Sequence, residues 1–288
     1  MDRGLVSGTL YVVATPLGHL GDVSARAIEI LTTVPIVAAE DTRHSRKLLT
    51  HLGARPELLS IHQHTPSERL ADVVARLVAG TDVALVTDAG TPAVSDPGAR
   101  LVAAARAADI LIIPIPGPSA VATALSASGF PADRYLFLGF LERKGAERAS
   151  QLQAVITSPW TVVVFEAANR LVATLRNLAD AGSGEREAVV CREMTKVHEE
   201  YRAGTLDTLA AYYKEHPPKG EVTLVVRAAT GGMEEGQGGQ EGQEIRAREV
   251  AARLLQGGLS KRDVVKALQE TMHLSRNEAY QIVTGLDA

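Results

Sequence analysis

The sequence predicts an α/β protein with two αβα domains and a small all-α module after them. Three observations support this prediction. Short β-forming runs alternate with amphipathic stretches from residue 9 to about residue 228, as in helices layered on largely parallel sheets. A Ser-Gly-Phe-Pro segment at 128–131 marks the best division between two halves. A glycine-rich segment at 230–244 then separates them from a C-terminal stretch with helical spacing.

The expected strands follow the β-forming runs. In the first domain, residues 1–126, they are Thr9–Ala14, Ile36–Ala39, Leu58–Ile61, Asp82–Thr87 and Ile110–Ile115. In the second domain, residues 127–228, they are Tyr135–Gly139, Trp160–Glu166, Ala188–Arg192, Glu199–Ala203 and Val222–Arg227. A helix is expected between Pro66 and Gly80, with Gly80 as its C-cap. Its apolar face consists of Leu70, Val73, Val74, Leu77 and Val78.

The C-terminal part is expected to differ in kind. Residues 229–244 read as a flexible acidic linker, because glycine, glutamine and glutamate leave little to bury. In the module 245–288, Ser260 with Asp263 and Ser275 with Glu278 match the capping box that begins a helix. Three short helices with tight turns would resemble a helix-turn-helix unit. A packing or dimerisation appendage remains an equal alternative.

Composition restricts the possible classes. With 45% hydrophobic and 22% charged residues, the chain is typical of a soluble globular enzyme. The single cysteine, Cys191, excludes an intramolecular disulfide and is expected to be a buried strand residue rather than a nucleophile. No apolar run reaches the roughly 18 residues of a membrane span, and Met1 to Gly8 lack a secretory signal, so we expect a cytoplasmic protein. The net charge of −4 means that RNA contact requires locally clustered positive charge.

Three loops replace the common ligand-binding motifs. The sequence has no Walker A loop, no dinucleotide fingerprint after a strand, no zinc signature and no hydrolase nucleophile elbow. Instead, loops rich in glycine and proline lie at the ends of three expected strands, at Thr15–Asp22, Asp88–Gly98 and Pro114–Ala120. Ligands of open α/β sheets bind beyond the carboxyl ends of strands. Ser119 is expected to be an N-cap, with free backbone N–H groups beside it that suit an anionic group.

Several motifs give a specific resemblance. These are LYVVATPLGHLGD, AAEDTRHSRKLL, VTDAGTPAVSDPG, PIPGPSA, a FLGFL stretch before RKG, REMTK and KGE. With them, residues 9–228 resemble the tetrapyrrole-methylase superfamily, in its branch of small-subunit ribosomal RNA methyltransferases I. The Glu-Asp-Thr-Arg-His string at 40–44 is distinctive of that branch, and the helical module is similar to the family's C-terminal extension.

The resemblance implies S-adenosylmethionine as cofactor, bound in the cleft between two αβα domains of a homodimer. It implies methyl transfer to the 2′-oxygen of a decoding-centre cytidine in 16S ribosomal RNA, with the small ribosomal subunit as partner and neither DNA nor a membrane involved. The residues implied to bind the cofactor are Leu17, Asp88, Ala89, Gly90, Val94, Ser95, Ser119, Ala120, Glu166 and Gly220; no metal site is implied.

The sequence leaves alternatives open for the residues that bind and activate the methyl acceptor. A 2′-hydroxyl needs a base or a strong hydrogen-bond acceptor, and Asp41 and Glu40 follow a strand as catalytic candidates. Cations beside carboxylates suit the phosphates that flank a target nucleotide. The candidates for substrate binding are Arg43, His44, Arg46 and Lys196. The alternative is that the cations between 43 and 47 form the solvated face of a helix over 43–52, and that Lys196 is a surface lysine.

The sequence departs from the family pattern at three places. His19 stands where asparagine is usual, and Ala93 stands where glycine is common. The segment Phe165–Arg170 stands where Tyr-Glu-Ser-Pro-His-Arg is usual, so Glu166 and Arg170 match the pattern and no role is carried over to residues 167–169. Two other functions remain open: a methyltransferase for a small porphyrin or corrin, and a non-catalytic RNA-binding assembly factor.

The charge of the C-terminal module generates one prediction. Residues 245–288 hold seven basic and five acidic residues, so the module carries +2 and the rest of the chain −6. We expect truncation after Ala229 to leave cofactor binding intact but to weaken binding to small ribosomal subunits. For each phosphate that residues such as Arg253, Lys261 and Arg262 no longer neutralise, the log–log salt slope should flatten by roughly 0.7–0.9. Equal salt slopes for truncated and full-length protein would show that the module only packs.

Overall fold

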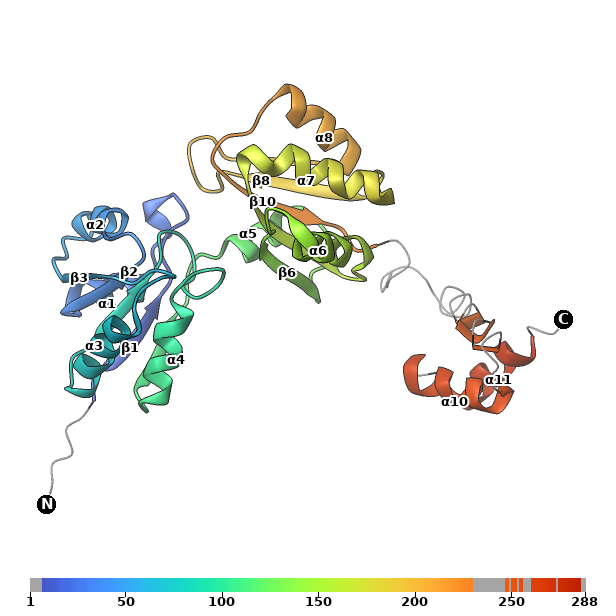
Figure 1. Cartoon of the computed structure of the whole chain (residues 1–288), viewed down its shortest axis with the longest axis horizontal. Helices are drawn as coiled ribbons and strands as arrows, with labels where there is room; N and C mark the ends of the chain where they lie inside the picture. Colours follow the sequence, from blue (N-terminus) through green and yellow to red (C-terminus); the bar gives the residue numbers. More distant parts are fainter. Residues whose placement is uncertain are drawn as a thin grey trace, which may run out of the picture. The chain divides into compact units, whose positions relative to one another are not determined.

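The computed structural model describes residues 7–229, 247–248, 250–252, 254–255, 260–272 and 274–285. The chain forms two compact units, Met1–Thr230 and Gly231–Ala288 (Figure 1). Apart from Ala229, the predicted linker at 229–244 lies outside the described residues. The division of the first unit at residue 126 remains a prediction.

The first unit begins with a parallel sheet of five strands. They are β1 (Thr9–Val13), β2 (Ile36–Ala39), β3 (Glu57–Ser60), β4 (Val83–Val86) and β5 (Leu111–Ile115). Their order is β3-β2-β4-β1-β5, and every neighbouring pair is parallel. The carboxyl ends of all five strands therefore meet at one edge.

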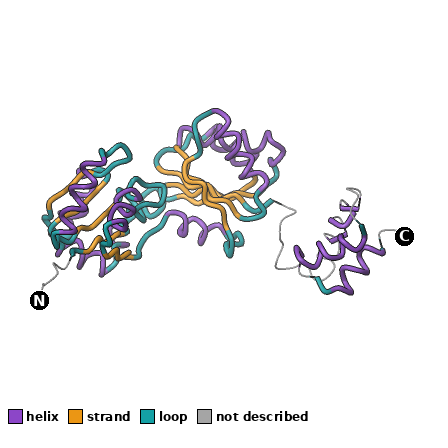
Figure 2. The backbone as a smooth tube through the Cα atoms, turned by 60° about the horizontal axis from the view of Figure 1, so that its bottom comes forward, coloured by secondary structure: helices purple, strands orange, loops and turns teal. Residues whose placement is uncertain are grey.

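Helices cover both faces of this sheet, since alternate residues of each strand point to opposite sides (Figure 2). Leu70 of α3 (Ser67–Val78) and Leu101 of α4 (Ala99–Ala107) pack on one face. Leu31 of α1 (Ala25–Thr33) and Leu48 of α2 (Thr42–His51) pack on the other. A short 3-10 helix, η1, lies at Leu20–Asp22 before α1.

The second sheet is mixed. It contains β6 (Tyr135–Phe140), β7 (Thr161–Ala167), β8 (Glu187–Arg192), β9 (Glu200–Thr205) and β10 (Glu221–Val226) in the order β6-β7-β10-β8-β9. Only β6 and β7 are parallel; the other three pairs are antiparallel. The prediction of largely parallel sheets is therefore wrong for this half. The reason is that β8 and β9 are joined directly by a seven-residue segment, too short for the crossover that a parallel pair needs.

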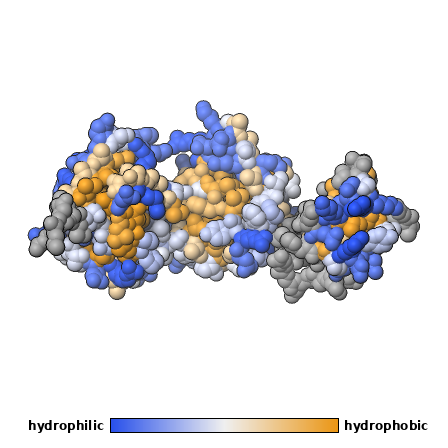
Figure 3. All heavy atoms as spheres, turned by 90° about the horizontal axis from the view of Figure 1, so that it is seen from below, coloured by the Kyte–Doolittle hydropathy of each residue, from blue (hydrophilic) through white to orange (hydrophobic). Residues whose placement is uncertain are grey.

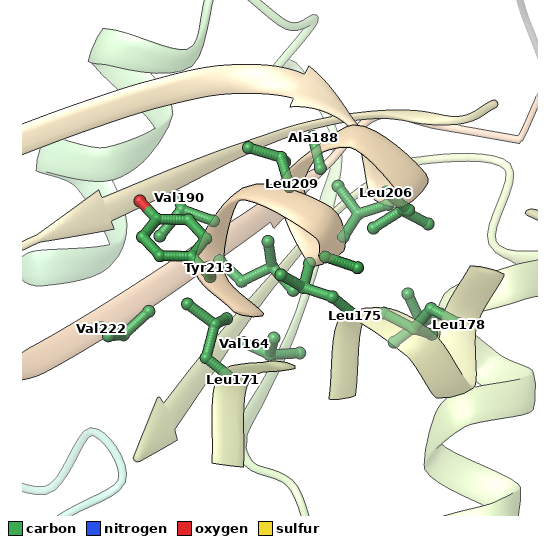
Figure 4. Packing of buried hydrophobic residues seen from close by; sticks show 14 of the residues in the cluster. Val164, Leu171, Leu175, Leu178, Ala188, Val190, Leu206, Leu209, Tyr213 and Val222 are labelled. Carbon is green, nitrogen blue, oxygen red and sulfur yellow. The ribbon is translucent and has the colours of Figure 1, made fainter. Parts of the chain in front are cut away.

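Helices again cover both faces of the second sheet. Leu175 of α7 (Leu171–Leu178) and Leu209 of α8 (Leu206–Glu215) pack against Val164 and Val190, with α6 (Gly145–Thr157) beside them (Figure 4). Short helical turns, η2 (Ala168–Arg170) and η3 (Ala179–Ser183), flank α7.

The opposite face is covered by α5 (Ala120–Ser128), through Val121, Ala124 and Leu125. The predicted boundary at residue 126 falls inside this helix, so packing groups α5 with the second sheet. Leu17 of the first half belongs to the same apolar cluster. The two halves therefore share buried surface.

Local sequence signals agree with the structure at most elements. Strands occur in all ten predicted places, with ends displaced by at most two residues. The helix after Pro66 ends in the predicted glycine cap: Gly80 has a φ of +92°, and Thr81 N–H donates to Arg76 O at 3.0 Å. Val78, expected on the apolar face, is instead 51% exposed.

The second unit contains α10 (Lys261–Met272) and α11 (Arg276–Thr284). Val264, Leu268 and Ile282 share an apolar core with helical residues between 247 and 255. Ser275 and Glu278 form the predicted capping box. Ser260 Oγ accepts from Asp263 N–H at 3.3 Å, and the Asp263 carboxylate accepts from the Ser260 hydroxyl at 2.6 Å. No helix in the described part of the chain is long and apolar enough to span a membrane.

Candidate functional site

A cavity of about 290 Å³ opens between the two halves of the first unit. The first half lines it with Leu17, Thr87, Asp88, Ala89, Val94, Ser95 and Asp96, which follow β1 and β4. Ala120 of α5 adds to this wall. The second half lines it with Phe140, Phe165, Glu166, Ala167, Met194 and the residues from Gly220 to Thr223. We call this space the first cavity.

Hydrogen bonds join the three predicted loops beside it. Thr15 and Gly90 exchange two backbone hydrogen bonds, of 2.9 and 3.0 Å, which tie the loop after β1 to the loop after β4. Thr91 Oγ1 donates to Pro118 O at 3.0 Å and ties the second loop to the third. Because β4, β1 and β5 are neighbours in the sheet, these loops form one continuous wall.

Eight of the ten residues expected to bind the cofactor line this cavity. They are Leu17, Asp88, Ala89, Val94, Ser95, Ala120, Glu166 and Gly220. The other two, Gly90 and Ser119, make hydrogen bonds that hold the backbone beside the cavity. Gly90, with a φ of +88°, makes the paired bonds to Thr15. Ser119 is the N-cap of α5, as predicted, and accepts from Ala122 N–H at 3.5 Å.

The rim of the first cavity is acidic. Asp88 Oδ1 accepts from the backbone N–H of Asp41 at 3.2 Å, which links the ends of β4 and β2. Burial raises the pKa of Asp96, although a bond from the Thr87 hydroxyl opposes this effect. Partial burial also raises the pKa of Glu40, and the nearby Asp96, Asp88 and Asp41 carboxylates raise it further. Glu40 itself is exposed and lines neither cavity described here.

Asp41 is engaged in a different way. It is the N-cap of α2, and its carboxylate accepts from Arg43 N–H at 2.8 Å, from Nε at 3.2 Å and from Nη2 at 3.0 Å. These bonds lower the pKa of Asp41 to about 2. A carboxylate so weakly basic and so fully paired is a poor proton acceptor.

Glu166 lies at the wall of the first cavity but faces protein donors. Its side chain is fully buried; Oε2 accepts from Thr174 Oγ1 at 2.6 Å, and Oε1 lies 3.1 Å from Arg170 Nε. Arg170 also donates to the carbonyl of Leu141 at 2.6 Å. Glu166 and Arg170, which match the family pattern in the segment Phe165–Arg170, thus form an ion pair whose carboxylate is fully buried. This pairing favours a structural role of Glu166 over direct contact with a ligand.

A second cavity, of about 460 Å³, adjoins the first. It shares Leu17, Thr87, Asp88, Ala89 and Glu221 with it. Its other lining residues are Thr15, Pro16, Gly18, Leu20, His44, Ser45, Lys47, Leu48 and Lys196. Of the predicted substrate residues, His44 and Lys196 are therefore at this cavity. Arg43 and Arg46 are exposed on α2 outside it.

Lys196 is fixed by two carboxylates. Its Nζ lies 3.0 Å from Glu193 Oε1 and 3.0 Å from Glu221 Oε2. Burial lowers the pKa of Lys196, but its bonds to Glu221 and Glu193 outweigh burial and raise it overall. Gly220 is required here, because a Cβ on it would lie 2.2 Å from Glu193 Oε1. A Cβ on Gly18 would similarly lie 2.3 Å from Lys196 Cγ, so the loops of the two halves meet closely.

The departures from the family pattern have local explanations. His19 caps η1, and its Nδ1 accepts from Gly21 N–H at 3.2 Å, a capping role that asparagine also fills. Ala93 has a φ of +68°, a conformation that favours the family's glycine. Ala167 lines the first cavity, whereas Asn169 does not.

Sequence reasoning missed several lining residues. Val222 and Thr223 lie within β10, so no loop motif marks them. Phe140 was missed for a similar reason, at the end of an edge strand. Phe165 and Thr87 each precede a predicted residue and could have been included by adjacency. Cys191 is fully buried, and burial raises the pKa of its thiol to about 12, which fits the expected strand residue. Among the described residues, no group of His, Cys, Asp or Glu could hold a metal ion.

Comparison with known families gives one match over most of the chain. Residues 9–210 match the model described as tetrapyrrole (corrin/porphyrin) methylases. Two solved structures share the fold: a uroporphyrin-III-C-methyltransferase from Thermus thermophilus, with a TM-score of 0.57 and 21% identity, and a cobalt precorrin-4 methyltransferase, with 0.60 and 18%. They cover 76% and 79% of this chain, and 94% and 97% of their own.

Relatives of higher identity carry another name. The ribosomal RNA small subunit methyltransferase I of Synechocystis sp. is 43% identical over 281 residues, which is 98% of this chain and 99% of the relative. The protein of the same name from Micromonospora olivasterospora is 42% identical, over 96% of this chain and 87% of its own. That from Pseudomonas aeruginosa is 48% identical over 68% and 70%.

The buried ion pair generates a prediction on stability. Replacing Glu166 with alanine removes the acceptor of the Thr174 hydroxyl and the partner of Arg170 Nε. We therefore expect a loss of roughly 3 kcal/mol in the free energy of unfolding. Denaturant unfolding measures this loss. Exposed Glu147→Ala on α6 is the control and should stay within about 0.5 kcal/mol of wild type. Normal stability of Glu166→Ala would instead favour the ligand role expected from sequence.

Proposed function

The chain belongs to the tetrapyrrole (corrin/porphyrin) methylase family, within its group of ribosomal RNA small subunit methyltransferases I, and from this premise we propose that it methylates small-subunit ribosomal RNA. The methyl donor is S-adenosylmethionine. We further propose that the acceptor is the 2′-hydroxyl of a decoding-centre cytidine. The observation that carries the proposal is the pair of adjoining cavities, which share Asp88 and Ala89 and are built from both halves of the fold.

The first cavity fits the cofactor chemically. Apolar side chains such as Leu17, Val94 and Met194 suit the nucleoside and the aliphatic carbons of the methionyl chain. The carboxylates of Asp88 and Asp96 suit a sulfonium cation. Ala120, at the start of α5, offers a helix N-terminus to the carboxylate of the amino-acid end. When bound, S-adenosylmethionine supplies an electrophilic methyl group.

The protein must also take a proton from the acceptor hydroxyl, which is a poor nucleophile in its neutral form. Of the two candidate carboxylates, Glu40 is better suited than Asp41. Its pKa is raised whereas that of Asp41 is lowered, so the Glu40 carboxylate is the stronger base. Glu40 directly precedes Asp41, whose backbone N–H contacts Asp88 of both cavities. Asp41 is occupied by Arg43 and orients the start of α2. We therefore assign the base to Glu40 and a positioning role to Asp41.

A homodimer remains part of the proposal. Both β5 and β6 are edge strands, and they expose Leu111, Tyr135 and Phe140 by 58%, 47% and 57%. Figure 3 shows apolar residues gathered over both halves of the first unit on one face. Exposed apolar side chains on sheet edges are typical of surfaces covered by another chain.

The activity is tested by methyl transfer from tritium-labelled S-adenosylmethionine. We expect label in small ribosomal subunits that lack this modification, and none in uroporphyrinogen. Nuclease digestion of the labelled RNA then identifies the nucleoside, which should be 2′-O-methylcytidine. Label in the tetrapyrrole and none in RNA would reverse the proposal. Binding of the cofactor by calorimetry, without transfer to either acceptor, would indicate a non-catalytic RNA-binding factor.

The charge of Asp88 is expected to matter for the cofactor. Asp88→Ala should weaken S-adenosylmethionine binding by on the order of tenfold, about 1.4 kcal/mol, with the fold intact. Asp88→Asn separates two effects, because the amide oxygen can still accept from Asp41 N–H while the charge is gone. Calorimetry gives both dissociation constants. An unchanged constant in both variants, with normal thermal unfolding, would remove Asp88 from the cofactor site.

Measurements of kcat distinguish Glu40 from Asp41 as the proton acceptor. Glu40→Gln should lower kcat on the order of 10²–10⁴-fold, because the proton acceptor is gone, with little change in cofactor affinity. Asp41→Asn still caps α2 and should lower kcat far less. Because the active form of Glu40 is the carboxylate and its pKa is raised above the ordinary value for glutamate, wild-type kcat should fall as the pH decreases through that raised pKa. Glu40→Gln should lack this acidic limb. A larger loss in Asp41→Asn than in Glu40→Gln would make Asp41 the base.

A further inference from the structure

The second cavity is lined by a buried hydroxyl that has no hydrogen-bond partner. Ser45, on α2, is only 3% exposed, and no partner for its Oγ exists among the described residues. Most buried polar side-chain atoms in proteins are hydrogen-bonded, because an unpaired buried hydroxyl costs free energy. The other such atom in the described part of the chain is Arg186 Nη2, whose guanidinium makes three other bonds. Ser45 Oγ makes none.

The Ser45 hydroxyl does not make the intrahelical hydrogen bond that is common for serine and threonine in helices. A helical serine or threonine can donate to a backbone carbonyl four residues earlier. Thr33 does so to Glu29 O at 2.8 Å, and Thr284 to Tyr280 O at 2.8 Å. Ser45 Oγ has no such bond to Asp41 O, which accepts only the backbone N–H of Ser45, at 3.0 Å. The hydroxyl therefore has no hydrogen-bond partner among the described residues, although Ser45 lies in the wall of the second cavity.

Ser45 is placed close to the junction of the two cavities. Its backbone N–H donates to Asp41 O, so it lies four residues, about 6 Å along the helix axis, after Asp41. Asp41 N–H in turn contacts Asp88, which lines both cavities. A group bound beside Ser45 is thus near the place where the methyl group is to be delivered, yet Ser45 does not line the first cavity.

The rest of the lining has the chemistry of a nucleotide site. Pro16, Leu20 and Leu48 offer apolar surface to the face of a base. His44 and Lys47, one residue before Ser45 and two after it on α2, have no salt bridge in the part of the chain that the structure describes. Lys196 is committed to two carboxylates, so Lys47 is the cation left for a phosphate.

We propose that the second cavity is the subsite for the acceptor nucleotide and that the Ser45 hydroxyl hydrogen-bonds this nucleotide. The inference rests on the proposed function, because it takes RNA as the acceptor. It adds a substrate-binding residue that the Glu-Asp-Thr-Arg-His motif does not include. The hydroxyl remains unpaired in the free protein because its partner is the substrate.

The test compares kinetics with stability. Ser45→Ala should lower kcat/KM for small ribosomal subunits that lack the methyl group by about threefold to tenfold, the range of one neutral hydrogen bond. Its dissociation constant for S-adenosylmethionine should equal that of wild type. Its thermal unfolding midpoint should be unchanged or higher, since an unpaired buried group is removed. Ser45→Thr keeps the hydroxyl and should retain most of the wild-type kcat/KM. The matched control is Thr50→Ala, because Thr50 is exposed on the same helix and outside both cavities. This variant should change neither kcat/KM, nor the dissociation constant, nor the unfolding midpoint.

The outcomes separate this inference from the function on which it rests. If wild type transfers no methyl group to subunits, the proposed function fails. If wild type is active and Ser45→Ala has the same kcat/KM, only the assignment of Ser45 fails. A lowered unfolding midpoint with normal kinetics would likewise overturn it, and would show that the hydroxyl serves the folded state alone.

Discussion

The row of strand ends in the first sheet is the constraint on which the site depends. The order β2-β4-β1-β5, all parallel, brings four carboxyl ends side by side, so residues far apart in sequence become neighbours. Backbone hydrogen bonds then fix the connecting loops: Thr15 with Gly90, and Asp41 with Asp88. Without that order, the Glu-Asp-Thr-Arg-His turn would not meet the Asp88 loop. The acidic rim and both cavities follow from these two contacts.

The second half completes this edge through a strained connection. Between β8 and β9, Glu193 and Thr195 have φ values of +50° and +65°, which are costly for residues with a Cβ. This backbone lets Glu193 hold Lys196 against Gly18 and lets Thr195 Oγ1 accept from the backbone N–H of His19 at 3.1 Å. The strain is thus offset by contacts between halves. The contact between Lys196 and Glu221 also joins the REMTK and KGE motifs, which β9 and α8 separate along the chain.

Local signals sufficed for the elements and for most of the first cavity. Alternating apolar runs located every strand, and Gly80 and Ser119 marked helix ends, because these features depend on neighbouring residues. The pairing of strands could not be read in this way, since it depends on the connection between β8 and β9. The local engagement of Asp41 could not be read from the sequence either. Its pairing with Arg43 depends on the side-chain geometry at the start of α2, which the motif alone does not reveal.

Several residues near the two cavities have conformations or surroundings that cost stability. Ala93 and Ser95 hold φ values of +68° and +57°, each a cost on the order of 1–2 kcal/mol for a residue with a Cβ. Glu40 is placed among other carboxylates, which disfavours its charged form. Ser45 is buried without a partner. Stability alone would remove each of these features by a glycine, a neutral residue or an alanine. The proposed ligands would supply what the free protein lacks at this edge: a cation for the carboxylates, a proton donor for Glu40 and a hydrogen bond for Ser45.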